Sequence, residues 1–179
     1  MFDIDLMNST GLQKIISKGG IDKRGAKQKI TFEQDNIEED IIYQWFDYIL
    51  NGKEKPSIFK TMGMLSFTAA EGFITLKCKA TDQHLNPMGG VHGGFAATVL
   101  DSVTGCAVHS LLEPGVSYGT VDLSVKMLRP VPLEEELIAE AKVTHLSRTL
   151  GVAEGVIKTL DGKLLASGSA TCFIRRPKD

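Results

Sequence analysis

The chain has 179 residues, of which 42% are apolar and 23% are charged, a composition typical of one globular domain with a substantial core and a short appendage. Its formal net charge is −2, so it lacks the overall positive field that holds nucleic acid or an anionic membrane surface. No apolar run approaches the length of a membrane span, and the acidic N-terminus does not look like a secretory signal, so we expect a cytoplasmic protein without nucleic-acid or membrane partners.

The N-terminal third is predicted to be an appendage. Residues 1–35 carry scattered charge and only weak helical periodicity, which is typical of a loosely attached arm. Asn36 can cap a helix over residues 36–50, because apolar residues recur there at helical spacing. We therefore predict an arm and an amphipathic helix over residues 1–55 and the main domain over residues 56–179.

From about residue 60 the periodicity changes to that of strands. Asp161-Gly162 predicts a tight hairpin turn, because this pair tolerates positive φ at both central positions. About six strands are predicted, mostly antiparallel, over residues 61–69, 72–80, 121–127, 137–143, 152–160 and 164–174.

A single helix, over residues 91–111, interrupts the strands. It is apolar nearly all round, which indicates a buried helix rather than one that lies on a surface. One long buried helix inside one curled antiparallel sheet is an α+β fold.

Two features near this helix suggest chemistry. Asp101 lies mid-helix with no Lys or Arg three or four residues away, so no local ion pair compensates its burial. The run Gly89-Gly90-Val91-His92-Gly93-Gly94 leads into the helix, whose N-terminal N–H groups suit a developing oxyanion. The alternatives are an exposed or internally paired acid and a glycine-rich loop that merely enters the helix. Neither GxGxxG nor a Walker loop is present.

The spacing of these two features predicts a dimer. Gly93 and Asp101 are eight residues apart, about 12 Å along a helix. A base and an oxyanion donor must each lie roughly 3 Å from the reacting centre. One helix cannot do both for one substrate, whereas two antiparallel helices across a two-fold axis can.

The three cysteines and four histidines have no metal-like spacing. Cys78, Cys106 and Cys172 form no CxxC pair, and the histidines lack HxxxH and HExxH patterns. We expect buried thiols in a reducing compartment and no metal ion.

The segment from Asn86 to Asp101, with the later Thr120-Val-Asp-Leu-Ser-Val strand and Leu128-Arg129-Pro130, resembles the PaaI-like (phenylacetate-degradation type) hotdog-fold thioesterases. The resemblance covers about residues 56–174. It implies a hotdog fold, a curled antiparallel sheet around one long central helix, here with an N-terminal helical extension. It also implies hydrolysis of acyl- or aryl-CoA thioesters by homodimers or dimers of dimers, with CoA as part of the substrate and no separate cofactor.

The resemblance also implies roles for single residues. Asp101 stands where the family has its base or nucleophile, and Gly93 where a backbone N–H polarises the thioester carbonyl. Asn86 matches an amide that orients substrate or water, and Thr120 a hydroxyl that helps to hold the attacking water. His92 and Gly94 would contact substrate beside Gly93, with His92 shaping the loop rather than acting as a base.

The CoA phosphates require local basic groups. Arg148 is the first choice, because Ser147 to Gly151 is predicted to form the bend between two strands, where a nucleotide could lie. The other candidates are Lys126, Arg129, Arg175 and Arg176.

Two other functions remain open from the sequence. A hotdog hydratase or dehydratase needs an Asp–His pair, and His92 is too far from Asp101 on one chain, which leaves only a pair across subunits. A non-catalytic acyl-CoA binding or sensing module needs no turnover at all, although no DNA-binding helix-turn-helix is recognisable.

Overall fold

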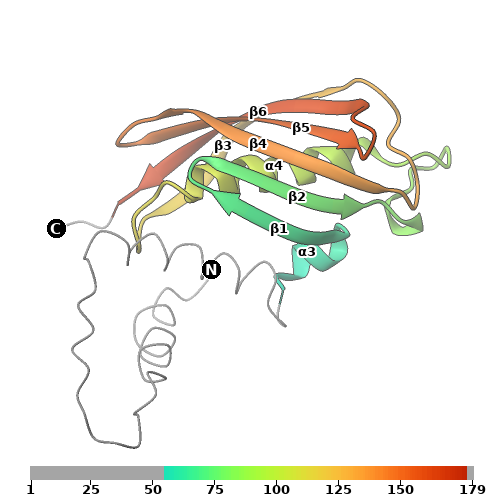
Figure 1. Cartoon of the computed structure of the whole chain (residues 1–179), viewed down its shortest axis with the longest axis horizontal. Helices are drawn as coiled ribbons and strands as arrows, with labels where there is room; N and C mark the ends of the chain where they lie inside the picture. Colours follow the sequence, from blue (N-terminus) through green and yellow to red (C-terminus); the bar gives the residue numbers. More distant parts are fainter. Residues whose placement is uncertain (1–54, 177–179) are drawn as a thin grey trace, which may run out of the picture. The chain divides into compact units, whose positions relative to one another are not determined.

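A computed structural model describes residues 55–176 of the chain (Figure 1). A short helix α3 (Ser57–Thr61) precedes the strands, a 3-10 turn (Asp82–His84) follows the second strand, and one long helix α4 (Gly93–His109) divides the strands into two groups. The strands are β1 (Met64–Ala70), β2 (Phe73–Lys79), β3 (Ser117–Met127), β4 (Glu136–Leu146), β5 (Leu150–Thr159) and β6 (Leu164–Arg175).

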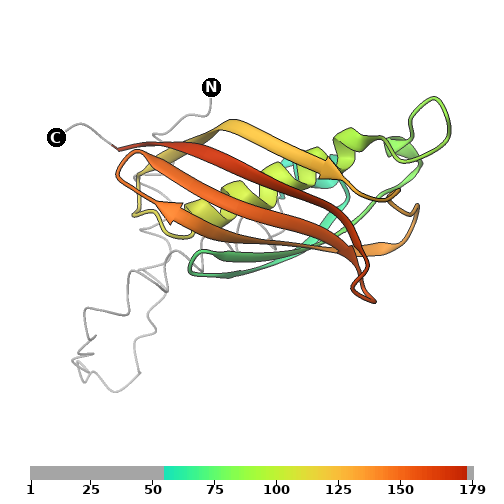
Figure 2. The ribbon, with the colours of Figure 1, turned by 90° about the horizontal axis from the view of Figure 1, so that it is seen from above.

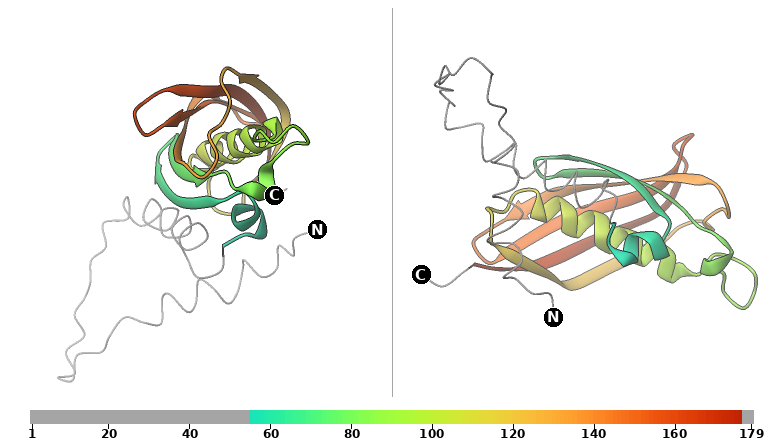
Figure 3. Two further views of the ribbon diagram at one scale, coloured as in Figure 1. Left: turned by 90° about the vertical axis from the view of Figure 1, so that its right-hand side faces the viewer. Right: turned by 90° about the horizontal axis from the view of Figure 1, so that it is seen from below.

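The six strands form one antiparallel sheet in the order β1-β2-β4-β5-β6-β3. The sheet curls around α4, as the end-on view in Figure 3 shows, and α4 runs along its inner face in Figure 2. The predicted α+β hotdog fold is therefore confirmed for the described residues, down to the number of strands and the single central helix.

The helix is buried because its apolar residues face the strands on several sides. Most side chains from Phe95 to Val108 are inaccessible to solvent, including Val99, Leu100 and Val103. The less buried positions, Gly94, Ala97, Thr98, Asp101 and Ser102, recur at helical spacing and form one face of small or polar residues. Figure 3 (right) shows α4 in front of the sheet from this open side.

The strand β3 departs from the predicted pattern. It begins at Ser117, four residues earlier than the alternation indicated, and its register with β6 shifts between Thr120 and Asp122. Such a bulge interrupts the alternation of side chains. Val121 is consequently 65% exposed, although the pattern placed it with Leu123, Val125 and Met127. These three residues keep the alternation beyond the bulge, and Met127 reaches Gly93 of α4.

The remaining predictions concern the β5–β6 turn, the N-terminal residues and membrane-spanning segments. The predicted hairpin between β5 and β6 is confirmed, and Gly162 in its turn has positive φ. The predicted helix over residues 36–50 and the arm before it lie outside the described residues, and the domain division stays a prediction. No helix between residues 55 and 176 has both the length and the apolar character required to span a membrane.

Candidate active site

The N-terminus of α4 holds two adjacent glycines with different roles. His92 is the N-cap residue, and its Nδ1 accepts a hydrogen bond from the N–H of Gly94 at 2.8 Å. Within residues 55–176 the N–H of Gly93 donates to no acceptor. The His92 ring therefore occupies one of the two amides and leaves that of Gly93 as a donor for a ligand.

The loop before the helix is held in shape by Asn86. Its Oδ1 accepts hydrogen bonds from the N–H groups of Met88 (2.9 Å) and Gly90 (3.2 Å), and its backbone N–H donates to the carbonyl of Gly90 (2.8 Å). Asn86 is thus an organiser of the glycine-rich loop, and only its Nδ2 remains as a donor toward a substrate. The backbone N–H of His92 donates to the carbonyl of His84, which closes the loop.

Asp101 lies in the middle of α4 on the open face. Its Oδ1 is buried without a hydrogen-bond partner, and the described part of the chain supplies no Lys or Arg to pair with it. A buried polar atom without a hydrogen-bond partner lowers the stability of the fold by about 1–3 kcal/mol, and by more if the group is charged. The position of this oxygen therefore needs an explanation. The internally paired acid that the sequence left open as an alternative is not what the structure places here.

The edge strand β3 runs antiparallel along this face of α4. A Cβ on Gly93 would lie 2.5 Å from the sulfur of Met127, and a Cβ on Gly105 would lie 3.0 Å from the ring of Tyr118. Thr120 lies between these two contacts, and its hydroxyl is 3.9 Å from the Cys172 thiol. Met127 therefore covers Gly93. Thr120 lies along the helix near Asp101, and Tyr118 lies one turn further on, at Gly105.

The neighbours of Asp101 are uncharged at neutral pH. Burial raises the pKa of the Cys106 thiol to about 12, with a smaller contribution from Asp101, so this cysteine is no thiolate nucleophile. Burial also raises the pKa of Tyr118 and lowers that of His109 to about 4. The side chains near Asp101 therefore contribute no competing ionised group.

Met127, Tyr118 and His109 are neighbours of the site that the sequence did not indicate. Tyr118 precedes the alternating run that identified the strand, and the bulge after Thr120 hides the fact that Tyr118 and Thr120 face the helix together. The aromatic side chain two residues before Thr120 was the only available signal.

Arg148 lies at the opposite end of α4 from Gly93. It is in the turn between β4 and β5, where Gly151 packs against Val108 near the end of the helix. The helix has 17 residues and is thus about 25 Å long, so Arg148 and Gly93 of one chain are not neighbours. The carbonyl of Arg148 accepts a hydrogen bond from Arg176, whose guanidinium also pairs with Glu113.

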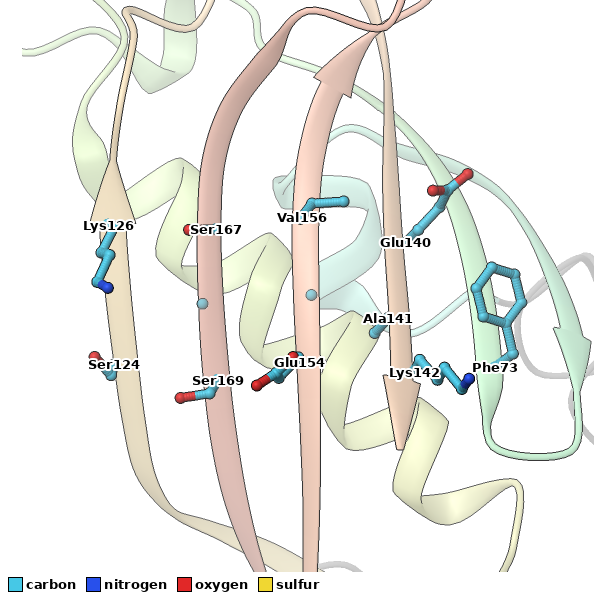
Figure 4. A pocket seen from close by; sticks show the side chains of 12 residues that line it. Phe73, Ser124, Lys126, Glu140, Ala141, Lys142, Glu154, Val156, Ser167 and Ser169 are labelled. Atoms are coloured by element: carbon cyan, nitrogen blue, oxygen red, sulfur yellow. The ribbon is translucent and has the colours of Figure 1, made fainter. Parts of the chain in front are cut away.

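The remaining basic candidates are dispersed. The guanidinium of Arg129 donates to the carbonyl of Leu164 at 2.6 Å, and Arg175 ends β6. Lys126 lines a hollow of about 520 Å³ on the outer face of the sheet, with Glu140, Lys142 and Glu154 (Figure 4). This hollow faces away from α4 and holds none of Asp101, Gly93 or Thr120, so we do not assign the chemistry to it.

Among residues 55–176, no three His, Cys, Asp or Glu side chains are grouped closely enough to hold a metal ion. The three cysteines are buried and unpaired, as predicted.

Comparisons with known proteins agree on one family. The thioesterase superfamily (4HBT) matches residues 88–166, which include the glycine-rich loop, Asp101 and most of the sheet. Acyl-coenzyme A thioesterase 13 of Mus musculus is 30% identical over 105 residues, which cover 58% of this chain and 74% of the mouse protein.

Solved structures give the same result. A phenylacetic acid degradation-related protein from Ralstonia eutropha is 29% identical, with a TM-score of 0.64 over 76% of this chain and 98% of that chain. Zebra fish thioesterase superfamily member 2 is 25% identical, with a TM-score of 0.62 over the same shares.

Proposed function

Because the chain belongs to the thioesterase superfamily, as its relatives and fold show, we propose that it hydrolyses a small acyl- or aryl-CoA thioester to the free acid and CoA. The observation that carries this proposal is the buried, unpartnered Oδ1 of Asp101 on the open face of α4. A carboxylate oxygen that is buried without a hydrogen-bond partner in the fold is available to bind a substrate or a water molecule.

The reaction needs a group that delivers oxygen to the acyl carbonyl. Asp101 acts either as the general base that takes a proton from the attacking water or as the nucleophile whose acyl adduct water then hydrolyses. Thr120 is positioned near the acid to hold that water. The thiolate of CoA is a good leaving group, so no strong general acid is required.

The reaction also needs a donor for the carbonyl oxygen as negative charge develops on it. The N–H of Gly93 fits this role, since it lies at the positive end of α4 and His92 engages its neighbour Gly94 instead. We assign substrate contacts to the Asn86 side-chain amide and the His92 ring, which belong to the loop that leads into α4.

The two groups belong to different copies of the chain. They are about 12 Å apart on one helix, too far to act on one carbonyl. In an antiparallel pair of helices, Asp101 of one chain faces Gly93 of the other, and two equivalent sites result. The homodimer is therefore part of the proposed function, and the dimer of dimers is an arrangement that the family resemblance implies.

Arg148 is compatible with this arrangement only across the dimer. It lies beyond the C-terminal end of its own α4, which in an antiparallel pair extends past the N-terminus of the partner helix. We retain it as the candidate for the CoA phosphates on the partner's side of the site.

The alternative functions are less well supported by the site. His92 and His109 are nine and eight residues from Asp101, so neither forms the Asp–His pair of a hydratase within one chain. A binding or sensing module would not require an unpartnered acid, whose burial costs stability.

Thiol release over a panel of acyl- and aryl-CoA thioesters tests the proposal. Asp101→Ala is expected to lower kcat by about 10²–10⁴-fold, the usual contribution of a general base. Removal of the unsatisfied oxygen should leave the urea midpoint of unfolding unchanged or higher.

Glu135→Ala, which removes an exposed acid, is the matched control and should keep the wild-type rate. A near-normal rate in Asp101→Ala would refute its role. Tight binding of acyl-CoA by the wild type without turnover would favour the sensing module.

A further inference from the structure

Tyr118 lies directly on the backbone of α4. A Cβ on Gly105 would lie 3.0 Å from Cε2 and 3.2 Å from the hydroxyl oxygen of Tyr118, so the glycine is what allows this close approach. The Tyr118 ring also contacts the ring of His109, with centroids 5.1 Å apart. The ring is thus wedged between two residues of the helix, one turn apart.

Tyr118 closes the open face of α4 on the C-terminal side of Asp101. Gly105 follows Asp101 by one helical turn, about 6 Å. Thr120, two residues along β3, lies on the same side of the strand, since both residues pair with the buried Cys172 and Ile174 of β6. The Tyr118 ring therefore lies beyond Asp101 and Thr120 in the direction of the C-terminal end of α4.

The direction of the acyl group follows from the symmetry of the proposed dimer. If Gly93 of one chain faces Asp101 of the other, the two-fold axis passes near Ala97, midway between them in sequence. Space toward Ala97 is shared by the two sites, so both acyl groups would meet there. In that arrangement the surface of α4 toward Gly105 belongs to one site only, and Tyr118 covers it at Gly105.

The surroundings of Tyr118 suit an apolar group. Cys106 and Cys172 are buried near it, and burial keeps both thiols protonated and His109 neutral. An acyl chain entering here would replace water against uncharged side chains, which favours binding.

We propose that Tyr118 is a specificity-determining residue, whose ring ends the acyl subsite beside Asp101 and restricts the enzyme to small acyl groups. This inference rests on the proposed function and deepens it, since it names the residue that limits the substrate. In this proposal the Tyr118 ring acts through its size, and its hydroxyl takes no part in proton transfer.

Saturation kinetics on straight-chain acyl-CoAs from acetyl to hexadecanoyl test the proposal. Tyr118→Ala is expected to raise kcat/KM for dodecanoyl-CoA relative to butanoyl-CoA by about tenfold or more, because one methylene in an apolar pocket already changes kcat/KM about tenfold. Tyr118→Leu, which keeps more of the packing, should shift the preference less, and Tyr118→Phe should keep the wild-type profile.

Phe173→Ala is the matched control. It removes a 49% exposed aromatic ring from β6, opposite Gly119 of β3, and should leave the chain-length profile unchanged. An unchanged profile in folded Tyr118→Ala and Tyr118→Leu overturns the proposal. So does an equal shift in Tyr118→Phe, which would assign the effect to the hydroxyl.

Binding separates this proposal from the proposed function. Non-hydrolysable S-alkyl-CoA thioethers of the same lengths are titrated calorimetrically into each variant. If the dependence of Kd on alkyl length changes in Tyr118→Ala, the acyl subsite is supported even when neither protein hydrolyses a thioester. Absence of hydrolysis would then overturn only the proposed function. Equal dependence of Kd on length in wild type and Tyr118→Ala overturns the subsite.

Discussion

Gly93 and Gly94 are identical neighbours in sequence, but their backbone amides are not equivalent. The His92 ring accepts from the N–H of Gly94, and the ring nitrogen that does so must be unprotonated. The N–H of Gly93 points to no acceptor in residues 55–176. A single capping side chain therefore selects which of two amides can serve an oxyanion.

Two substitutions at Gly93 separate the amide from the space around it. Gly93→Ala keeps the N–H but adds a Cβ that only the flexible Met127 side chain must avoid, so we expect a modest loss of rate. Gly93→Pro removes the N–H at the first helical position, where proline is tolerated, and His92 already has the extended backbone that precedes proline.

Gly93→Pro should therefore lower kcat by about 10²–10³-fold relative to Gly93→Ala, with little difference in thermal midpoint. Steady-state kinetics and circular dichroism of both proteins measure the two effects. Equal rates in the alanine and proline variants would show that the amide is not the donor.

His109 makes stability depend on pH. Burial lowers its pKa to about 4 from an ordinary value of 6.5, so the unfolded chain binds a proton more readily than the folded chain between these values. The stabilising contribution of neutral His109 is complete above pH 6.5 and is lost as the pH falls toward 4. His109→Phe should flatten this decline, as measured by urea unfolding from pH 4 to pH 8. A wild-type slope in that variant would assign the decline to other groups.

At this scale the sequence identified an acid and an amide but not their surroundings. Asp101 and Gly93 could be selected as candidates because an acid in an apolar helix and glycines at a helix start are visible in the sequence alone. Tyr118 and Met127 were not, because their contacts with the helix arise from the position of an edge strand and from a bulge within it. The role of Asn86 within its own loop also needed coordinates.

Among the elements, the start of β1 depends on a single glycine. Gly63 has φ +57°, and a Cβ there would overlap the backbone carbonyl oxygen of Lys79, at the end of β2. The same two residues are joined by a hydrogen bond from the N–H of Lys79 to the carbonyl of Gly63, at 2.9 Å. The β1–β2 hairpin is thus closed by a contact that only glycine permits.

Gly63→Ala should destabilise the fold more than Gly115→Ala. Gly115 also has positive φ (+83°) but has no atom within 4 Å of a Cβ, so its substitution carries only the backbone strain, about 1 kcal/mol. The overlap in Gly63→Ala should add at least about 1–3 kcal/mol. Urea unfolding curves give both values, and equal losses would mean that the strand end adjusts without cost.

The elements themselves were largely predictable. Alternating apolar residues specify β2, β4, β5 and β6 because one face of each packs on α4 while the other faces solvent. The strand β3 was predicted too short. It lies at the edge of the sheet, where few of its side chains are buried, so apolar and polar residues alternate less clearly along it.

For the whole molecule, the proposed division of each site between two chains makes a prediction that no single variant tests. A mixed dimer of Asp101→Ala and Gly93→Pro chains has one site with both defects and one site that is intact. Random pairing of equal amounts gives mixed dimers half of the time, so about one quarter of wild-type activity should return on mixing.

Co-expression of the two chains with different affinity tags, followed by thiol-release assay, measures this recovery. A mixture of either variant with itself, carrying both tags, is the control and should stay inactive. Failure of the mixed dimers to recover activity would place both groups within one chain and contradict the shared site.

The uncovered side of β3 bears on how much working enzyme a cell contains. This eleven-residue strand is hydrogen-bonded to β6 along one side, and within residues 55–176 no strand flanks the other. If this edge joins the contact between the paired α4 helices of the proposed dimer, then at low abundance the number of functional sites grows with the square of the number of chains. Expression level would then act as a threshold, below which doubling synthesis quadruples catalytic capacity.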